Sequence, residues 1–170
     1  MIPGQEKICP GSFSLKCSIQ SLRGDGMVIP SGPLAAMACI QGEGRIRGTV
    51  KFYPVECATL IVAQISGLPE NGSGFFGLHI HEGTSCLGEE YDKTKGHYDS
   101  TNSAHPNHAG DLPPLLSRGG RALLAVETDR INVWEIIGRT VVIHSLPDDF
   151  RTQPAGNAGR KIACGVICQR

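Results

Sequence analysis

The chain has 170 residues, and its 16 Lys and Arg balance 16 Asp and Glu, so its formal net charge at pH 7 is zero. This length fits one domain with a substantial core. A balanced charge provides no overall field for nucleic acid or an anionic membrane, so we expect neither as a partner. The longest uncharged stretch, residues 26–42, is interrupted by Pro30, Gly32 and Pro33 and is too short to span a bilayer.

The first 33 residues show no sustained period of 2 or 3.6 and carry scattered Gly, Pro and Ser. We therefore predict a loose N-terminal extension over residues 1–33, followed by one domain over residues 34–170. Patterned sequence begins just after Met27, which suggests the hypothesis that Met27 is the true start of translation. The chain begins without a basic segment followed by an apolar run, so we expect a cytoplasmic location.

Seven short runs rich in Val, Ile, Leu and Thr follow at close intervals, separated by turn-forming residues. They are LAAMACIQG, RIRGTVKFYP, ATLIVAQISGL, GFFGLHIHEG, RALLAVETD, RTVVIHSL and KIACGVIC. This spacing predicts an all-β protein, either a sandwich or a barrel. Residues 131–137, INVWEII, fit either a helical turn or an edge strand.

Two long segments lack strand character, residues 84–120 and residues 145–160. Both are crowded with Gly, Asp and Pro, and the first also holds three of the six histidines. Loops of this length in a compact domain are usually functional or disordered. We therefore expect functional residues in them.

In the run LHIHEG, His79 and His81 are two residues apart on a predicted strand, so both side chains project from one face. They can bind one ion together, although two polar residues on a solvated strand face would show the same spacing. His144 ends the apolar run RTVVIH, where an imidazole needs a partner. A metal and an ordinary core hydrogen bond both satisfy that need.

A denser cluster lies in GHYDSTNSAHPNHAGDL, which carries three histidines and an aspartate within fifteen residues. These are His97, His105, His108 and Asp111. Three imidazoles and one carboxylate form a complete tetrahedral set for structural zinc. A set of four imidazoles, made by the other three histidines and one from this loop, suits copper and also takes zinc.

The motifs HIH, HAGDLPPLL, IIGRTVVIHSLPDDF and above all PAGNAGRKIACGVI resemble the copper/zinc superoxide dismutase family. The resemblance runs from about residue 34 to residue 168. It implies a Greek-key β-barrel of eight strands, related to immunoglobulin-like sandwiches, with two long functional loops. It also implies copper and zinc as cofactors, superoxide as the substrate, and a possible homodimer.

The same resemblance implies individual roles. The copper ligands would be His79, His81, His97 and His144, and the zinc ligands would be His97, His105, His108 and Asp111. His97 would bridge both ions as imidazolate and act in catalysis. Asp148 would accept hydrogen bonds from the outer nitrogens of ligating histidines, although it also fits an ordinary turn. Cys86 would pair with Cys164, and this disulfide would raise the free energy of unfolding by about 4 kcal/mol because it closes a long loop.

Three departures from the family pattern stand out. Only two residues separate His105 from His108, so the loop folds more tightly there. The segment 145–160 is short for the charged loop that guides superoxide. Lys161 stands where the family usually has arginine, supplying a positive charge without the planar fork, so we expect reduced anion guidance from it. Its neighbour Arg160 should point to the opposite side.

The remaining cysteines have no assigned role: Cys9, Cys17, Cys39, Cys57 and Cys168. The default expectation for Cys39 and Cys57 is burial as small apolar residues. Two rival functions stay open beside copper-dependent dismutation of superoxide. One is a metal-binding relative without turnover, which holds zinc only, stores copper or delivers it. The other is a structural barrel, which has little reason to keep all six histidines in register.

Overall fold

The computed structural model describes residues 33–170, and these form a nearly closed barrel of eight antiparallel strands. The extension predicted over residues 1–33 and Met27 therefore lie, apart from residue 33, outside the described residues. The strands are β1 (Ala36–Gly42), β2 (Arg47–Val55), β3 (Ala58–Ser66), β4 (Phe75–His81), β5 (Asp111–Leu116), β6 (Arg121–Thr128), β7 (Thr140–His144) and β8 (Lys161–Gln169). The all-β prediction is confirmed.

The strands follow the order β5-β4-β7-β8-β1-β2-β3-β6, and the end strands β5 and β6 contact each other. Strands β1, β2 and β3 form a meander, and the chain then crosses to form β4. Later in the chain, β6 pairs with β3 and β7 pairs with β4. This is the predicted Greek-key arrangement. Phe52, Ile61, Phe76 and Leu115 are fully buried between the strands and form the centre of the core.

One strand was missed by the sequence pattern. Residues 84–120 were predicted to lack strand character, yet β5 runs through DLPPLL near the end of that segment. Pro113 and Pro114 cannot donate ladder hydrogen bonds, and prolines in sheets are confined to edges and irregular pairings. β5 is an end strand of the sheet order, and its pairing with β4 shifts register between Phe76 and Leu78.

Two short helical segments lie outside the barrel strands. The residues INVWEII form a helical turn, α1 (Val133–Ile136), so the helical alternative is the correct one. Asn132 begins it, and its side chain accepts a hydrogen bond from the amide of Trp134 at 3.0 Å. The other is a 3-10 segment, η1 (Glu89–Thr94), within the loop between β4 and β5. In the described part of the chain, no helix has the length and apolar character needed to cross a membrane.

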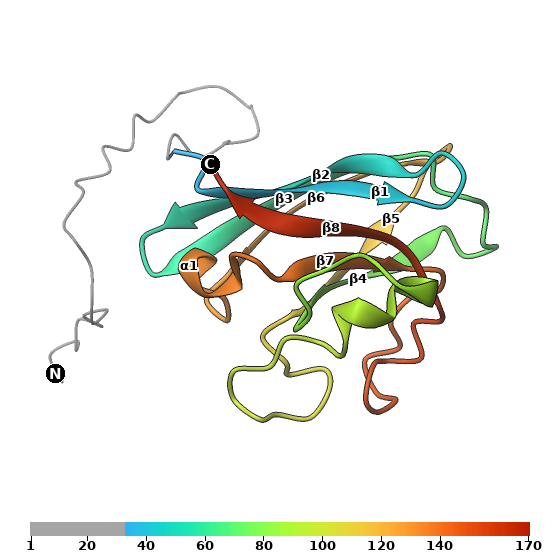
Figure 1. Ribbon diagram of the computed structural model, residues 1–170. Helices are drawn as coiled ribbons and strands as arrows, with labels where there is room; N and C mark the ends of the chain where they lie inside the picture. Colours follow the sequence, from blue (N-terminus) through green and yellow to red (C-terminus); the bar gives the residue numbers. More distant parts are fainter. Residues whose placement is uncertain (1–32) are drawn as a thin grey trace, which may run out of the picture.

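The two long loops lie on the same side of the barrel, next to β4 and β7 (Figure 1). The loop between β4 and β5, residues 82–110, carries η1, and the loop between β7 and β8 covers residues 145–160. The side chain of Gln153 joins them, since its Nε2 donates to the carbonyl of His105 at 2.6 Å and its Oε1 accepts from the amide of His105 at 3.0 Å.

Candidate metal centre

Strands β4 and β7 are neighbours in the sheet and supply three buried histidines. His79 and His81 come from β4, and His144 ends β7, where the pairing with β8 shifts register. Gly77 of β4 leaves room for His144, because a Cβ added at Gly77 would lie 3.3 Å from the Cβ of His144. The sheet thus sets the relative positions of these three rings.

The loop between β4 and β5 brings a fourth ring to this group. His97 forms an isolated bridge with His81, and its ring centroid lies 4.0 Å from that of His79. One ligand nitrogen from each of the four histidines, His79, His81, His97 and His144, lies within 4.8 Å of the others. The structure therefore brings the four expected copper ligands together, and all four side chains are buried.

Hydrogen bonds fix which nitrogen of each ring faces the centre of this group. The Nδ1 of His81 lies 2.9 Å from the carbonyl of Lys95, and the Nδ1 of His144 lies 3.2 Å from the carbonyl of Gly159. A carbonyl only accepts, so we assign the proton of each ring to Nδ1. The two Nε2 lone pairs then face each other at 3.2 Å, an arrangement that a cation between them would stabilise.

The other two rings also leave one nitrogen without a partner. The Nε2 of His79 lies 2.8 Å from Asp148, and the Nδ1 of His97 lies 2.7 Å from Asp111. The opposite nitrogens, Nδ1 of His79 and Nε2 of His97, are buried with no hydrogen-bond partner. Buried polar atoms are rarely left unpaired. Four imidazole nitrogens directed at one point are therefore a fit for a metal that prefers imidazole, such as copper.

The second group comes from the loop between β4 and β5 and the first residue of β5, and it shares His97 with the first. Its members are His97, His105, His108 and Asp111, whose ligand atoms again lie within 4.8 Å of one another. The Nδ1 atoms of His105 and His108 lie 3.1 and 3.2 Å from one oxygen of Asp111, yet neither nitrogen makes a hydrogen bond. Three imidazoles and a carboxylate that converge in this way fit zinc.

Asp148 contacts one histidine of each group, at the ring nitrogen opposite the one that faces the other ligands. Its two oxygens lie 2.8 Å from the Nε2 of His79 and 2.9 Å from the Nε2 of His105. Such a carboxylate orients ligating imidazoles and fixes their tautomers. The backbone at Gly156, with a φ of 63°, lies close against the side chain of Asp148. Only glycine fits there, because an added Cβ would lie 2.0 Å from the Oδ1 of Asp148.

Burial and charge keep the rings neutral and the carboxylates ionised. Burial lowers the pKa of His144 to about 3, and burial also lowers the pKa of His79 and, more strongly, that of His81. Burial opposes ionisation of Asp111 and Asp148, but hydrogen bonds from histidines outweigh it and lower both pKa values. At neutral pH these histidines present lone pairs and the aspartates present negative charge, as metal binding requires.

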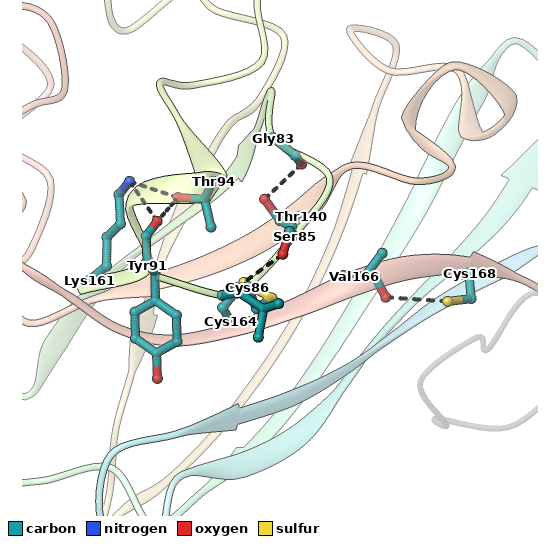
Figure 2. The surroundings of a disulfide bond; sticks show 11 residues. Gly83, Ser85, Cys86, Tyr91, Thr94, Thr140, Lys161, Cys164, Val166 and Cys168 are labelled. Carbon is teal, nitrogen blue, oxygen red and sulfur yellow. Dashed lines mark hydrogen bonds between the residues drawn. A yellow bond between two sulfur atoms is a disulfide. The ribbon is translucent and has the colours of Figure 1, made fainter. Parts of the chain in front are cut away.

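Lys161 stands at the start of β8, beside the first group of histidines. Its Nζ donates to the Oγ1 of Thr94 at 2.7 Å and to the carbonyl of Tyr91 at 3.4 Å (Figure 2). It also donates to the carbonyl of Lys95 at 3.0 Å. Burial lowers the pKa of Lys161. The carbonyl of Lys95 also faces His81, so one loop carbonyl holds both side chains. The sequence carries no signal for this role of Lys95, because any residue type supplies the same backbone carbonyl.

Arg160 does not share this position. Its guanidinium pairs with both oxygens of Glu43 on the turn between β1 and β2. Neighbouring residues of an extended chain point to opposite sides, which is why the sequence predicted different directions for Arg160 and Lys161. Lys161 is therefore the cation that the strand places next to the loop of the histidines.

The predicted disulfide is present. Cys86 in the loop and Cys164 in β8 are bonded, with Cα atoms 5.7 Å apart, and the two residues are 78 positions apart in sequence (Figure 2). The prediction for Cys39 and Cys57 was wrong, since both are exposed: Cys39 is on the outward-facing side of β1, and Cys57 lies in the turn between β2 and β3. Cys39 and Cys168 are free thiols, and Cys9 and Cys17 lie outside the described residues.

Comparison with known proteins places this geometry in a family. A family profile described as copper/zinc superoxide dismutase matches residues 46–167, most of the described barrel. The chain belongs to the copper/zinc superoxide dismutase family. It is 34% identical to superoxide dismutase [Cu-Zn] 2 of Aquifex aeolicus over 143 residues, which cover 75% of the chain and 82% of that protein. It is also 34% identical to superoxide dismutase [Cu-Zn] of Deinococcus radiodurans, over 79% of the chain and 84% of that protein.

Members with a different name match at similar identity. The copper chaperone for superoxide dismutase of Mus musculus is 32% identical over 149 residues, which cover 79% of this chain but only 53% of the chaperone. The chain thus spans about half the length of that relative. Copper and zinc, the cofactors expected from the sequence, fit both the family and the two groups of converging ligands.

Proposed function

We propose that this chain is a superoxide dismutase, in which two superoxide anions and two protons yield oxygen and hydrogen peroxide. His79, His81, His97 and His144 would hold copper, and His97, His105, His108 and Asp111 would hold zinc. Copper would supply one-electron redox chemistry, and zinc, which has no redox chemistry here, would supply a fixed positive charge. The observation that carries the proposal is His97, whose two ring nitrogens face the two groups.

The side chains around His97 define what the protein contributes. The Nε2 of His97 is buried without a partner and faces the copper ligands, so we place at this atom the proton that is passed to the second superoxide. Asp111 lies 2.7 Å from the opposite nitrogen, and as a fellow zinc ligand it would keep the ring in place during that transfer. A general acid must be held within reach of the atom that receives its proton.

The positive charge of Lys161 attracts superoxide toward the metal centre. Its ammonium is fixed by the loop at Thr94 and Lys95, so the positive charge stays at one point rather than moving with a flexible stem. A fixed local charge raises the concentration of an anion near it even where the net charge is zero. The ammonium is already shared among three acceptors, which supports weaker guidance than a free arginine fork would give.

Copper delivery is a second candidate, because copper chaperones are among the relatives. A delivery protein needs ligands that release copper readily, and the sequence contains no C-x-C motif, since Cys164 and Cys168 are four positions apart. Four buried imidazoles held by strand geometry and by a shared aspartate favour retention of the metal. The architecture therefore favours turnover over delivery.

The test measures copper and zinc per chain and superoxide consumption, before and after copper loading, for the unaltered protein and for His144→Ala. We expect loading to produce activity, and the substitution to reduce activity by about a hundredfold or more, since even indirect partners of metal ligands change activity by about 10–100-fold. Ser145→Ala, next to the ligand, should keep full activity.

The same preparations distinguish the rival functions. Copper-loaded protein is mixed with a copper-free superoxide dismutase as acceptor, and copper transfer is followed. Activity of the loaded chain with slow transfer supports the proposal. Rapid transfer without activity of its own would establish delivery instead, and superoxide loss that needs no copper and survives His144→Ala would refute the mechanism.

A further inference from the structure

Four exposed arginines gather at the turns that close one end of the barrel. Arg45 lies in the turn between β1 and β2, Arg47 begins β2, Arg118 lies in the turn between β5 and β6, and Arg121 begins β6. The sheet register places Arg47 opposite Ser66 of β3, and Ser66 opposite Arg121. Arg47 and Arg121 therefore flank one serine on three adjacent strands, so their closeness is fixed by the strand pairing.

A hollow of about 840 Å³ lies between these turns. Arg45, Arg47 and Arg121 line it, together with Ser66, Ser117 and glycines of the surrounding turns. Arg118 lines a neighbouring hollow that also includes Arg47 and Arg121. A hollow of this size matches the range of about 300–1,000 Å³ in which proteins bind small molecules.

The positive charge of this hollow is not neutralised by nearby acids. Among residues 33–170, none of these four arginines forms an ion pair. Glu43, in the same turn as Arg45, directs its carboxylate to Arg160 instead. Glu70 is the one acid among the described residues that line the hollow. Three arginines against one glutamate leave an excess of positive charge in a chain whose net charge is zero.

From this arrangement we infer a second anion site, which binds a compact polyanion carrying two or more phosphate or sulfate groups. Guanidinium groups bind such groups through paired, charge-assisted hydrogen bonds, and arginines on separate turns can contact separate groups of one ligand. None of the lining residues belongs to either group of metal ligands. The site is therefore distinct from the metal centre and does not depend on the proposed activity.

The test is titration calorimetry on the full-length, metal-loaded chain, with fructose bisphosphate and sucrose octasulfate as separate probes. We expect one site per chain and an affinity that falls as salt is added. In Arg47→Gln/Arg121→Gln the affinity should fall by about a hundredfold, because each hydrogen-bonded charged contact is worth about tenfold or more. Inositol hexakisphosphate and inositol hexakissulfate, which share one framework and the same number of groups, then show which of the two groups the site prefers.

Two further variants separate a built site from general attraction. Lys51→Gln/Arg170→Gln removes the same charge from residues outside the hollow and should leave affinity nearly unchanged. Glu70→Gln should strengthen binding, because it removes the acid that lines the hollow. An unchanged far-ultraviolet circular dichroism spectrum and an unchanged denaturation midpoint in the arginine variant would show that the fold is intact. Failure of both probes to bind at millimolar concentration, or equal weakening in the two double variants, would overturn the inference.

Discussion

The two halves of the metal centre are built from different kinds of structure. Three of the four proposed copper ligands stand on β4 and β7 inside the sheet, whereas all four proposed zinc ligands come from the loop before β5 or from the first residue of that strand. Strand pairing fixes the first half through the backbone. The second half depends on side-chain contacts with other elements, and this difference predicts which changes affect which metal.

Among the attachments that hold the loop half in place, three come from other elements. The disulfide joins the loop to β8, Gln153 joins it to the loop before β8, and Asp148 joins His105 to His79. Each attachment comes from a segment that is distant in sequence. The zinc half should therefore loosen when any one of them is removed, while the copper half keeps its three strand-borne rings.

The largest effect should come from removing the disulfide, in Cys86→Ser/Cys164→Ser. Because the two cysteines are 78 positions apart in sequence, the free energy of unfolding should fall by about 4 kcal/mol. Denaturant titration of the metal-free protein measures this loss, and chelator competition should show that zinc affinity falls more than copper affinity. The control is Cys39→Ser/Cys168→Ser, which changes two exposed free thiols. Equal loss of both metals would contradict the division between the halves.

A smaller effect should follow from Asp148→Asn. An amide cannot accept hydrogen bonds at both of its ends, so either His79 or His105 loses its partner. We expect copper or zinc affinity, or both, to fall by about 10–100-fold, as for other partners of metal-binding histidines. Asp149→Asn is the matched control, because Asp149 is exposed and its side chain accepts hydrogen bonds from residues 151 and 152 of its own loop and not from a histidine. If both variants bound metal equally well, Asp148 would be an ordinary turn residue.

The smallest effect should come from Lys161. Lys161→Met should lower kcat/KM for superoxide by about tenfold or less with copper content unchanged, and should reduce the salt dependence of the rate. Thr94→Val removes the shortest hydrogen bond of the ammonium but keeps its charge. If Thr94→Val matched Lys161→Met in rate and in salt dependence, the lysine would act by anchoring the loop and not by attracting the anion.

The sequence predicted more of the strand half than of the loop half. Alternation of side chains placed His79 and His81 on one face, and apolar runs located seven of the eight strands. The eighth, β5, was missed because Pro113 and Pro114 suggest a loop, and only its place at the end of the sheet order makes them acceptable. Cys39 was misjudged for a related reason: residue type favoured burial, but its position on β1 faces outward.

The disulfide between distant segments was predicted only through the family resemblance. The pairing of Cys86 with Cys164 was predicted in that way and is present. The carbonyl of Lys95, which lies at hydrogen-bonding distance from both His81 and Lys161, was not predicted at all. Loop backbone positions follow from tertiary packing, and no local pattern in the sequence encodes them.

The central claim is that one imidazole, that of His97, serves both groups of ligands. The most direct test loads both groups with copper(II) and records the electron paramagnetic resonance spectrum. Two copper(II) ions joined through one imidazolate are magnetically coupled, so we predict loss of the ordinary copper signal at neutral pH and its return in His97→Ala. Two independent signals of full intensity in the unaltered protein, with copper shown to fill both groups, would contradict the account.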